Sequence, residues 1–382
     1  MKCSLEVLPV ELVDHIVTLL ELQDILSLRL TSRTLESKIS HAKIFAHKHV
    51  KLDEEHLRSM VYMTSPGRPG SLLQHCTIVG NAGSDMSNTP NSDEHVRLLT
   101  EAFINLKKHS PRARLVSLRL KVITGGRGPS DGILGYISRR DRSATALRVF
   151  DVTIAALHAS ELPVDEHLNL FGGVSQCDLS SSAFLSINQR FASMPIFRTL
   201  KKLTVKLSSS IVRPGNSSQS THETRLLQGV LEMSVIMPEL EHLDIRGYDI
   251  ANGYPEPLMD STVKPNRSNQ PHLLHLKKCT LRGLYVLDSD LLELLKAVHP
   301  VALTMTYIRL ASGTWASIFE YMTSSDSPVR HYHLDDLRES KRLVHFDTRH
   351  TKEVKEVIRY SIALRRALQS MRMTTGGSCV DA

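Results

Sequence analysis

Apolar residues recur at helical spacing near the start of the chain. Between residues 8 and 20 they fall every three or four positions, which is the period of an α-helix. Pro9 suits the first turn of this helix, because its φ angle is already helical and no amide hydrogen is needed there. Asp24 suits the start of a second helix, and a third runs from near Ser32 towards Ile39. The pattern therefore predicts three short helices.

These helices carry more leucine and isoleucine than so small a unit can bury. Helices of this length are marginal alone in water, so they need packing partners. Part of their apolar surface must meet the following domain or another protein. A plain helical cap on a larger core is the alternative interpretation.

From residue 93 onwards, helical runs alternate with strand-like runs. Such alternation predicts a parallel sheet, because each parallel return needs a crossover of about a dozen residues. We expect residues 41–50 to complete the third helix, and residues 52–63 and 72–79 to form a helix and a first strand. Further helices are expected at residues 93–109, 184–194, 222–237, 288–298 and 314–322, and strands at 115–122, 147–152, 200–207, 240–245, 302–308 and 329–334.

Three segments share a leucine pattern that is typical of leucine-rich repeats. They are Leu200-x-x-Leu203-x-Val205, Leu240-x-x-Leu243-x-Ile245 and Leu273-x-x-Leu276. Their steps exceed the roughly 20–29 residues of regular repeats, so the repeats are degenerate. We therefore expect an α/β fold in which residues 93–348 form an irregular leucine-rich-repeat-like solenoid; a compact α/β domain is the alternative.

The net charge of +7 is concentrated near the C-terminus. Residues 349–373 hold seven Lys or Arg against Glu353 and Glu356, with an apolar face at helical spacing. A basic helix of this kind can bind nucleic acid or an anionic membrane. We favour a solvated face on a helix that closes the solenoid, which repeat domains require. The expected domains are 1–50, a helical module; 51–92, a linker with a helix, a strand and a polar loop; 93–348, the repeat domain; and 349–382, the basic helix and a disordered tail.

Motifs for catalysis or cofactor binding are missing from the sequence. Gly125–Ser130 lacks the Gly-Lys-[Ser/Thr] of a phosphate loop, and we attribute the proximity of His331 and His333 to Asp335 to chance. Five cysteines without a C-x-x-C pair favour free thiols in a reducing compartment. We expect no enzyme activity, no metal, no cofactor, no secretory signal and no membrane span.

The segment 5–48 resembles an F-box. The matching residues are Leu8-Pro9, Glu11-Leu12, Ile16, Leu20, Asp24-Ile25, Leu28, Leu30 and Arg33, whereas Thr31 and Leu35 stand where the family usually has valine and an aromatic residue. The order helix, Pro, strand, then Ser-Gly-x-Trp315 before another helix also resembles fungal-type F-box proteins with degenerate leucine-rich repeats.

The resemblance implies a non-catalytic adaptor. Such proteins dock on a Skp-type adaptor, and through it on a cullin, and present a protein substrate for ubiquitylation, here an unknown one, in the cytoplasm, the nucleus or both. The adaptor-facing residues, or the scaffold for that face, would be Leu8, Pro9, Leu12, Ile16, Leu20, Ile25, Leu28, Leu30 and Leu35. The alternative is a scaffold protein that uses an F-box-like module without ligase activity.

Overall fold

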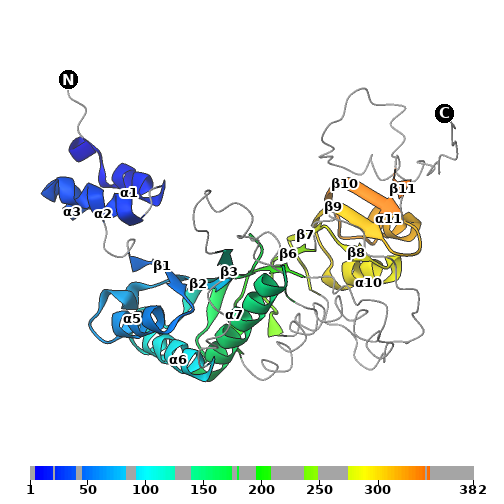
Figure 1. Ribbon diagram of the computed structural model, residues 1–382. Coiled ribbons are helices and arrows are strands. Elements are labelled where there is room, and N and C mark those ends of the chain that lie inside the picture. Colours follow the sequence, from blue (N-terminus) through cyan, green and yellow to red (C-terminus); the bar gives the residue numbers. More distant parts are fainter. Residues whose placement is uncertain are drawn as a thin grey trace, which may run out of the picture.

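A computed structural model gives the structure of the protein, which is a mixed α/β fold with a large, mostly parallel sheet (Figure 1). It describes residues 5–19, 22–39, 45–82, 92–124, 139–173, 179, 195–207, 236–247, 274–339 and 342–344. Helices near the N-terminus have a hydrophobic cluster of their own, separate from the main core beneath the sheet.

Helices occupy the N-terminal stretch that has the helical apolar period. A 3-10 turn, η1, precedes them, and Ser32 caps the third by accepting a hydrogen bond from the Thr34 amide at 3.1 Å. The elements are η1 (Leu5–Val7), α1 (Val10–Leu19), α2 (Leu22–Thr31) and α3 (Arg33–Lys38).

The described strands form one eleven-stranded sheet in which neighbours follow the order of the chain. Every pairing is parallel except that of β10 with β11, and β8 pairs only with β9. The strands are β1 (His47–Lys51), β2 (His75–Ala82), β3 (Leu115–Thr124), β4 (Val164–Leu170), β5 (Lys202–Lys206), β6 (His242–Arg246), β7 (Lys278–Arg282), β8 (Tyr285–Val286), β9 (Ala302–Leu310), β10 (His331–Glu339) and β11 (Arg342–Leu343).

The described crossover helices pack beside the two ends of this sheet. Helix α5 packs on α6, α6 on α7, and α7 on β2 and β3, while α10 and α11 lie together near β8–β10 (Figure 1). The remaining elements are α5 (Glu54–Thr64), η2 (Pro69–Leu72), α6 (Ser92–His109), α7 (Arg139–Ser160), η3 (Pro195–Phe197), α10 (Asp288–Val298) and α11 (Ala316–Thr323).

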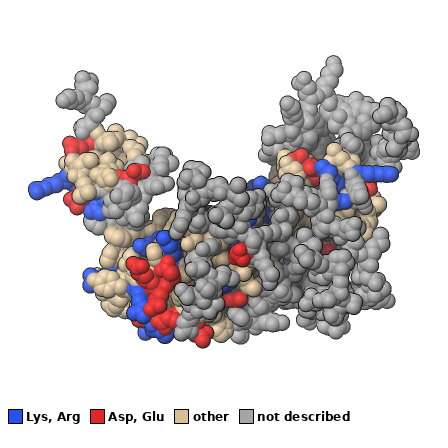
Figure 2. All heavy atoms as spheres, in the orientation of Figure 1, with Lys and Arg blue, Asp and Glu red and all other residues tan. Residues whose placement is uncertain are grey.

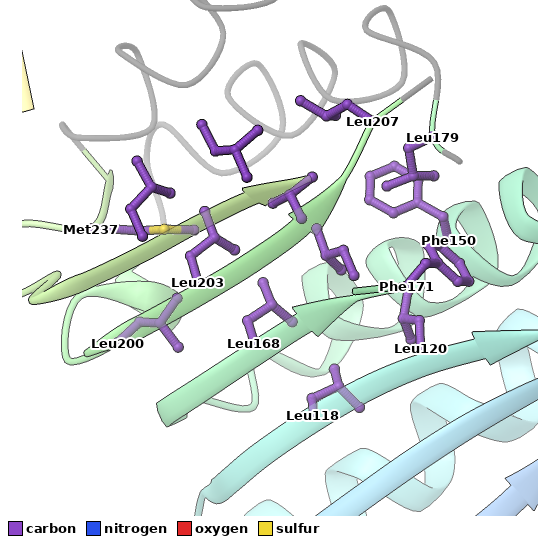
Figure 3. Close-up of a cluster of buried hydrophobic side chains, with 14 of the residues drawn as sticks. Leu118, Leu120, Phe150, Leu168, Phe171, Leu179, Leu200, Leu203, Leu207 and Met237 are labelled. Atoms are coloured by element: carbon purple, nitrogen blue, oxygen red, sulfur yellow. The ribbon is translucent and has the colours of Figure 1, made fainter. Parts of the chain in front are cut away.

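Two rows of apolar side chains cross the sheet and form its buried face. Because residues in register on parallel strands point to the same side, Leu118, Leu168 and Leu203 stack in one row (Figure 3). The register of β5 with β6 continues this row to Leu243. The second row lies two residues further along each strand and is equally buried. It contains Val50, Ile78, Leu120, Leu170, Val205, Ile245, Leu281 and Met305.

Two predicted elements are wrong, because tertiary packing and not the local pattern of apolar residues decides their structure. Residues 47–51 form β1, not the end of a helix, and β1 pairs with β2 at one end of the sheet. Residues 147–152 lie in α7, not in a strand. Helix α7 is buried on several sides, between α6 and the sheet, so its apolar residues show no single face.

The third leucine repeat was predicted in the wrong register. Residues Leu274–Leu276 lie before strand β7 and not in it. The strand residues Cys279 and Leu281 are the ones in register with Leu243 and Ile245. A cysteine in place of the expected leucine hid this alignment. The helices expected at 184–194 and 351–373, and most of that at 222–237, lie outside the described residues.

Candidate functional site

The described side chains of the N-terminal helices form a hydrophobic core of their own. Its buried members are Val13 and Val17 of α1 and Leu35 and Ile39 at α3, each at most 4% exposed. The partly buried residues around it are Leu8, Leu28 and Phe45. Each of these four described side chains contributes about 1.5–3 kcal/mol of hydrophobic stabilisation. Together they pack α1 against α3.

Large apolar side chains are unusually exposed on the same helices. Leu30 is 89% exposed, Val7 81% and Leu12 50%, and Leu5 and Val10 are also exposed. Figure 2 shows mostly uncharged atoms here, whereas α5 and α6 carry a dense mixture of acidic and basic side chains. Exposed apolar residues in such density are typical of a surface that a partner protein covers.

Polar contacts hold the first turn against α3. The Lys38 Nζ donates hydrogen bonds to the backbone oxygens of Glu6 at 2.6 Å and Leu8 at 2.8 Å. The Arg29 guanidinium forms an ion pair with Glu36 at 3.2 Å, which links α2 to α3. These contacts fix where η1 and the end of α2 present their exposed side chains.

The predicted site residues divide into three groups. Leu35 is buried in the core of the N-terminal helices, and Leu8, Ile16 and Leu28 are partly buried. Pro9, Leu12 and Leu30 are exposed, so their side chains are available to a partner. Leu20 lies outside the described residues, as does the side chain of Ile25.

Sequence reasoning missed the exposed Val7 and Val10 and the buried Val13 and Val17. A signal for the buried pair was present, because positions 13 and 17 share one helix face. The exposed valines carried no signal of their own, since an apolar residue in a helix is normally assigned to the core.

Residues 5–47 match the family model of the F-box domain. The chain carries an F-box domain. F-box domains in general bind Skp-type adaptors, so the match indicates a role of this kind for residues 5–47. The comparison with curated proteins finds no match.

The face of the sheet opposite the leucine rows is polar. One row of residues in register contains His47, His75, His167 and His242. The rings of His47 and His75 stack with centroids 4.2 Å apart, and His75 Nδ1 lies 2.8 Å from the Ser117 hydroxyl. Desolvation by burial lowers the pKa of all four histidines, and that of His167 falls to about 4. At neutral pH these rings are therefore uncharged.

Other kinds of site find no support in the described part of the chain. None of its helices is long and apolar enough to cross a membrane. The described side chains include no group of three or more His, Cys, Asp or Glu with the arrangement of a metal site, and His331, His333 and Asp335 on β10 form none. Burial raises the pKa of both Cys76 and Cys279 to about 12, so neither thiol is a ready nucleophile.

Proposed function

We propose that the protein is the substrate-recognition subunit of a Skp-cullin-F-box ubiquitin ligase. The observation that carries the proposal is the exposed apolar surface of the F-box domain, where Leu12 and Leu30 lie outside the core that the described side chains form. Fully burying such a side chain against a partner gains roughly 1.5–3 kcal/mol, so these residues would contribute to the affinity of the complex.

In this proposal the protein contributes proximity and no catalytic residue. The F-box domain docks on the Skp-type adaptor, and the sheet domain holds the substrate. Substrate lysines are then kept at high effective concentration near ubiquitin carried by a separate conjugating enzyme. The protein acts in the cytoplasm, the nucleus or both, where this machinery operates.

We infer further that the sheet domain is an irregular leucine-rich-repeat-like solenoid. The order of the strands along the chain and the stacking of Leu118, Leu168, Leu203 and Leu243 in one row support this. The spacing between equivalent residues from Leu118 to Cys279 varies from 35 to 50 residues, which makes the repeats irregular.

Co-purification with a Skp-type adaptor tests the main proposal. The Leu12→Ser and Leu30→Ser double variant changes two exposed side chains, so we expect it to fold normally and to lose most adaptor binding. The matched control is Leu147→Ser with Leu343→Ser, which changes two leucines of similar exposure to Leu12 outside the F-box domain. No complex with the unmutated chain, or equal loss in both variants, would refute the proposal.

A non-catalytic scaffold is the second candidate function. The exposed apolar surface explains binding to an adaptor but does not require that a cullin is recruited. Reconstitution with the adaptor and a cullin separates the two. A substrate-recognition subunit brings the cullin into the complex, whereas a scaffold of this kind binds the adaptor and leaves the cullin free.

A further inference from the structure

The polar face of the sheet carries a set of exposed cations. Arg119 and Lys121 extend from β3, Lys202 from β5, and Lys278 and Arg282 from β7, and all five side chains are exposed. They occupy alternate strand positions on the side opposite the leucine rows, since Arg119 is in register with Asn169, and Lys202 with His167 and His242, rather than with leucines.

These cations have no carboxylate partner in the described part of the chain. The described ion pairs involve other residues, such as Lys277 with Glu241 on the loop edge and Arg114 with Asp165. Among the registered positions of this face, Asp244 is held by Arg246 at 2.7 Å, and Asp335 lies at the far end on β10. Among the described residues, the positive charge at the centre of the face is therefore uncompensated.

The histidines report the same positive potential. Desolvation is the main cause that lowers the pKa of His49 and of His167. The positive charges of Lys121 and Arg119 lower the pKa of His49 further, and those of Lys202 and Arg119 lower that of His167. Glu166 acts in the opposite direction on His75. Because the histidine rings are neutral at neutral pH, they do not repel the neighbouring lysines and arginines.

We propose that this face binds an acidic, extended segment of a substrate protein, with Lys202, Lys278 and Arg119 as its main anchors. The inference rests on the proposed substrate-recognition role and names the chemistry of the substrate. Charge complementarity of this kind sets partner choice and association rate. The carboxylates of Asp and Glu are the matching partners for unpaired lysines and arginines on a polar surface.

The spacing of the anchors fits an extended peptide that crosses the strands. Lys202 and Lys278 are in the same row, with His242 of β6 between them. Neighbouring strands lie about 4.8 Å apart, so the two lysines extend from backbones roughly 10 Å apart. An extended chain covers that distance in about three residues. Because side chains of an extended chain alternate between its two sides, acidic residues two or four positions apart would face the sheet together and reach both ammonium groups through their flexible side chains.

A nucleic acid fits this face less well than an acidic peptide. Nucleic-acid-binding surfaces commonly present large aromatic side chains for bases to stack on, and the registered positions of this face hold no Phe, Tyr or Trp. Asp244 and Asp335 would also repel a continuous phosphate backbone. Isolated carboxylates on a peptide can avoid those two positions.

The test measures binding of a fluorescein-labelled, glutamate-rich peptide of about eight residues to the full chain by anisotropy. A lysine-rich peptide of equal length and a single-stranded DNA of equal charge are the comparison probes. We expect the acidic peptide to bind best and to weaken steeply as salt is added, because exposed charges are screened.

Charge-reversal variants locate the binding surface. Lys202→Glu with Lys278→Glu is expected to weaken peptide binding at least about tenfold. Lys108→Glu with Lys296→Glu makes the same change in net charge on exposed residues of α6 and α10 and is expected to leave binding within about twofold. The Lys202→Arg, Lys278→Arg variant keeps both positive charges and should retain binding. This result would show that the charge-reversal variant loses binding through its charge and not through misfolding.

Three results would overturn the inference. They are equal weakening by both charge-reversal pairs, no preference for the acidic peptide over the basic one, or tighter binding of the DNA. Adaptor co-purification with the Lys202→Glu, Lys278→Glu variant keeps the two proposals distinct, because the F-box domain is unchanged in it. A chain that binds the peptide through these lysines but binds no adaptor would refute the proposed function alone.

Discussion

Gly80 of β2 lies directly against Val149 of α7. A Cβ atom built on Gly80 would come within 2.5 Å of the Val149 Cγ2 and 2.7 Å of the Thr145 Cγ2. No Cβ atom tolerates such contacts, so the glycine sets how closely the longest described helix approaches the sheet. The neighbouring strand supports the same contact, because Gly80 is in register with the buried Val122 of β3.

We expect Gly80→Ala to destabilise the protein by about 1–3 kcal/mol, because the helix must shift to admit a methyl group. Urea denaturation followed by circular dichroism measures the change. Gly173→Ala is the control, since nothing lies within 4 Å of its added Cβ and we expect little effect there. Adding Val149→Ala should recover part of the loss, and strictly additive effects of the two substitutions would contradict the contact.

Replacing Lys38 by Met should loosen the start of the F-box domain. The substitution keeps the length of the side chain and removes the two hydrogen bonds to the Glu6 and Leu8 carbonyl oxygens. We expect a loss of about 1–2 kcal/mol in local stability and faster amide exchange in residues 5–17. Hydrogen exchange followed by mass spectrometry tests this, and Lys48→Met, outside the F-box helices, is the control. Unchanged exchange would show that these bonds do not hold the turn.

The stability of the sheet domain should fall as the pH is lowered from 7 to 4. The pKa of His167 is about 4 in the folded protein, against an ordinary value of 6.5, because burial disfavours the charged ring. Between these two values the unfolded chain binds the extra proton and the folded chain does not, so acid favours unfolding. His47, His75 and His242 act in the same direction.

His167→Gln should reduce this pH dependence. Glutamine has no charge to gain in acid and retains polar atoms near the Thr204 hydroxyl, which lies 3.1 Å from His167 Nε2. Urea midpoints at pH 7 and pH 5 measure the difference for both proteins. An equal shift in the two would show that His167 is not a source of the acid sensitivity.

Cys76 and Cys279 should resist alkylation in the folded protein. Both are buried and both have a pKa raised to about 12, so almost no thiolate is present at neutral pH. Treatment with iodoacetamide, with and without urea, followed by peptide mass spectrometry gives the labelling of each site. Rapid labelling of either residue without urea would contradict its placement in the core.

Elements with one apolar face could be predicted from the sequence. Residues 288–298 were expected to be a helix and form α10, and the expected helix at 93–109 corresponds to α6. In both helices, one face meets the core and the other meets solvent, which gives the spacing its clear period. Helix α7 has neighbours on more sides, and its run at 147–152 imitated the alternation of a strand.

The candidate site was located by sequence, but not its division into core and surface. Leu12, Leu30 and Leu35 carry the same kind of side chain at helical spacing, yet Leu35 is 4% exposed and Leu30 is 89% exposed. Which of them faces a partner depends on how α1 and α3 pack. The polar face of the sheet was not predicted at all, because its cations come from strands far apart in the chain.

The sequence alone determined that an F-box domain begins this chain and that helices and strands alternate after it, since short-range spacing encodes both. The tertiary structure alone decided that Cys279 aligns with Leu243, and that Lys202 and Lys278 share a row. Register between parallel strands depends on how crossovers of unequal length return the chain to the sheet. No local pattern carries that information, because it arises only when distant segments pack on one core.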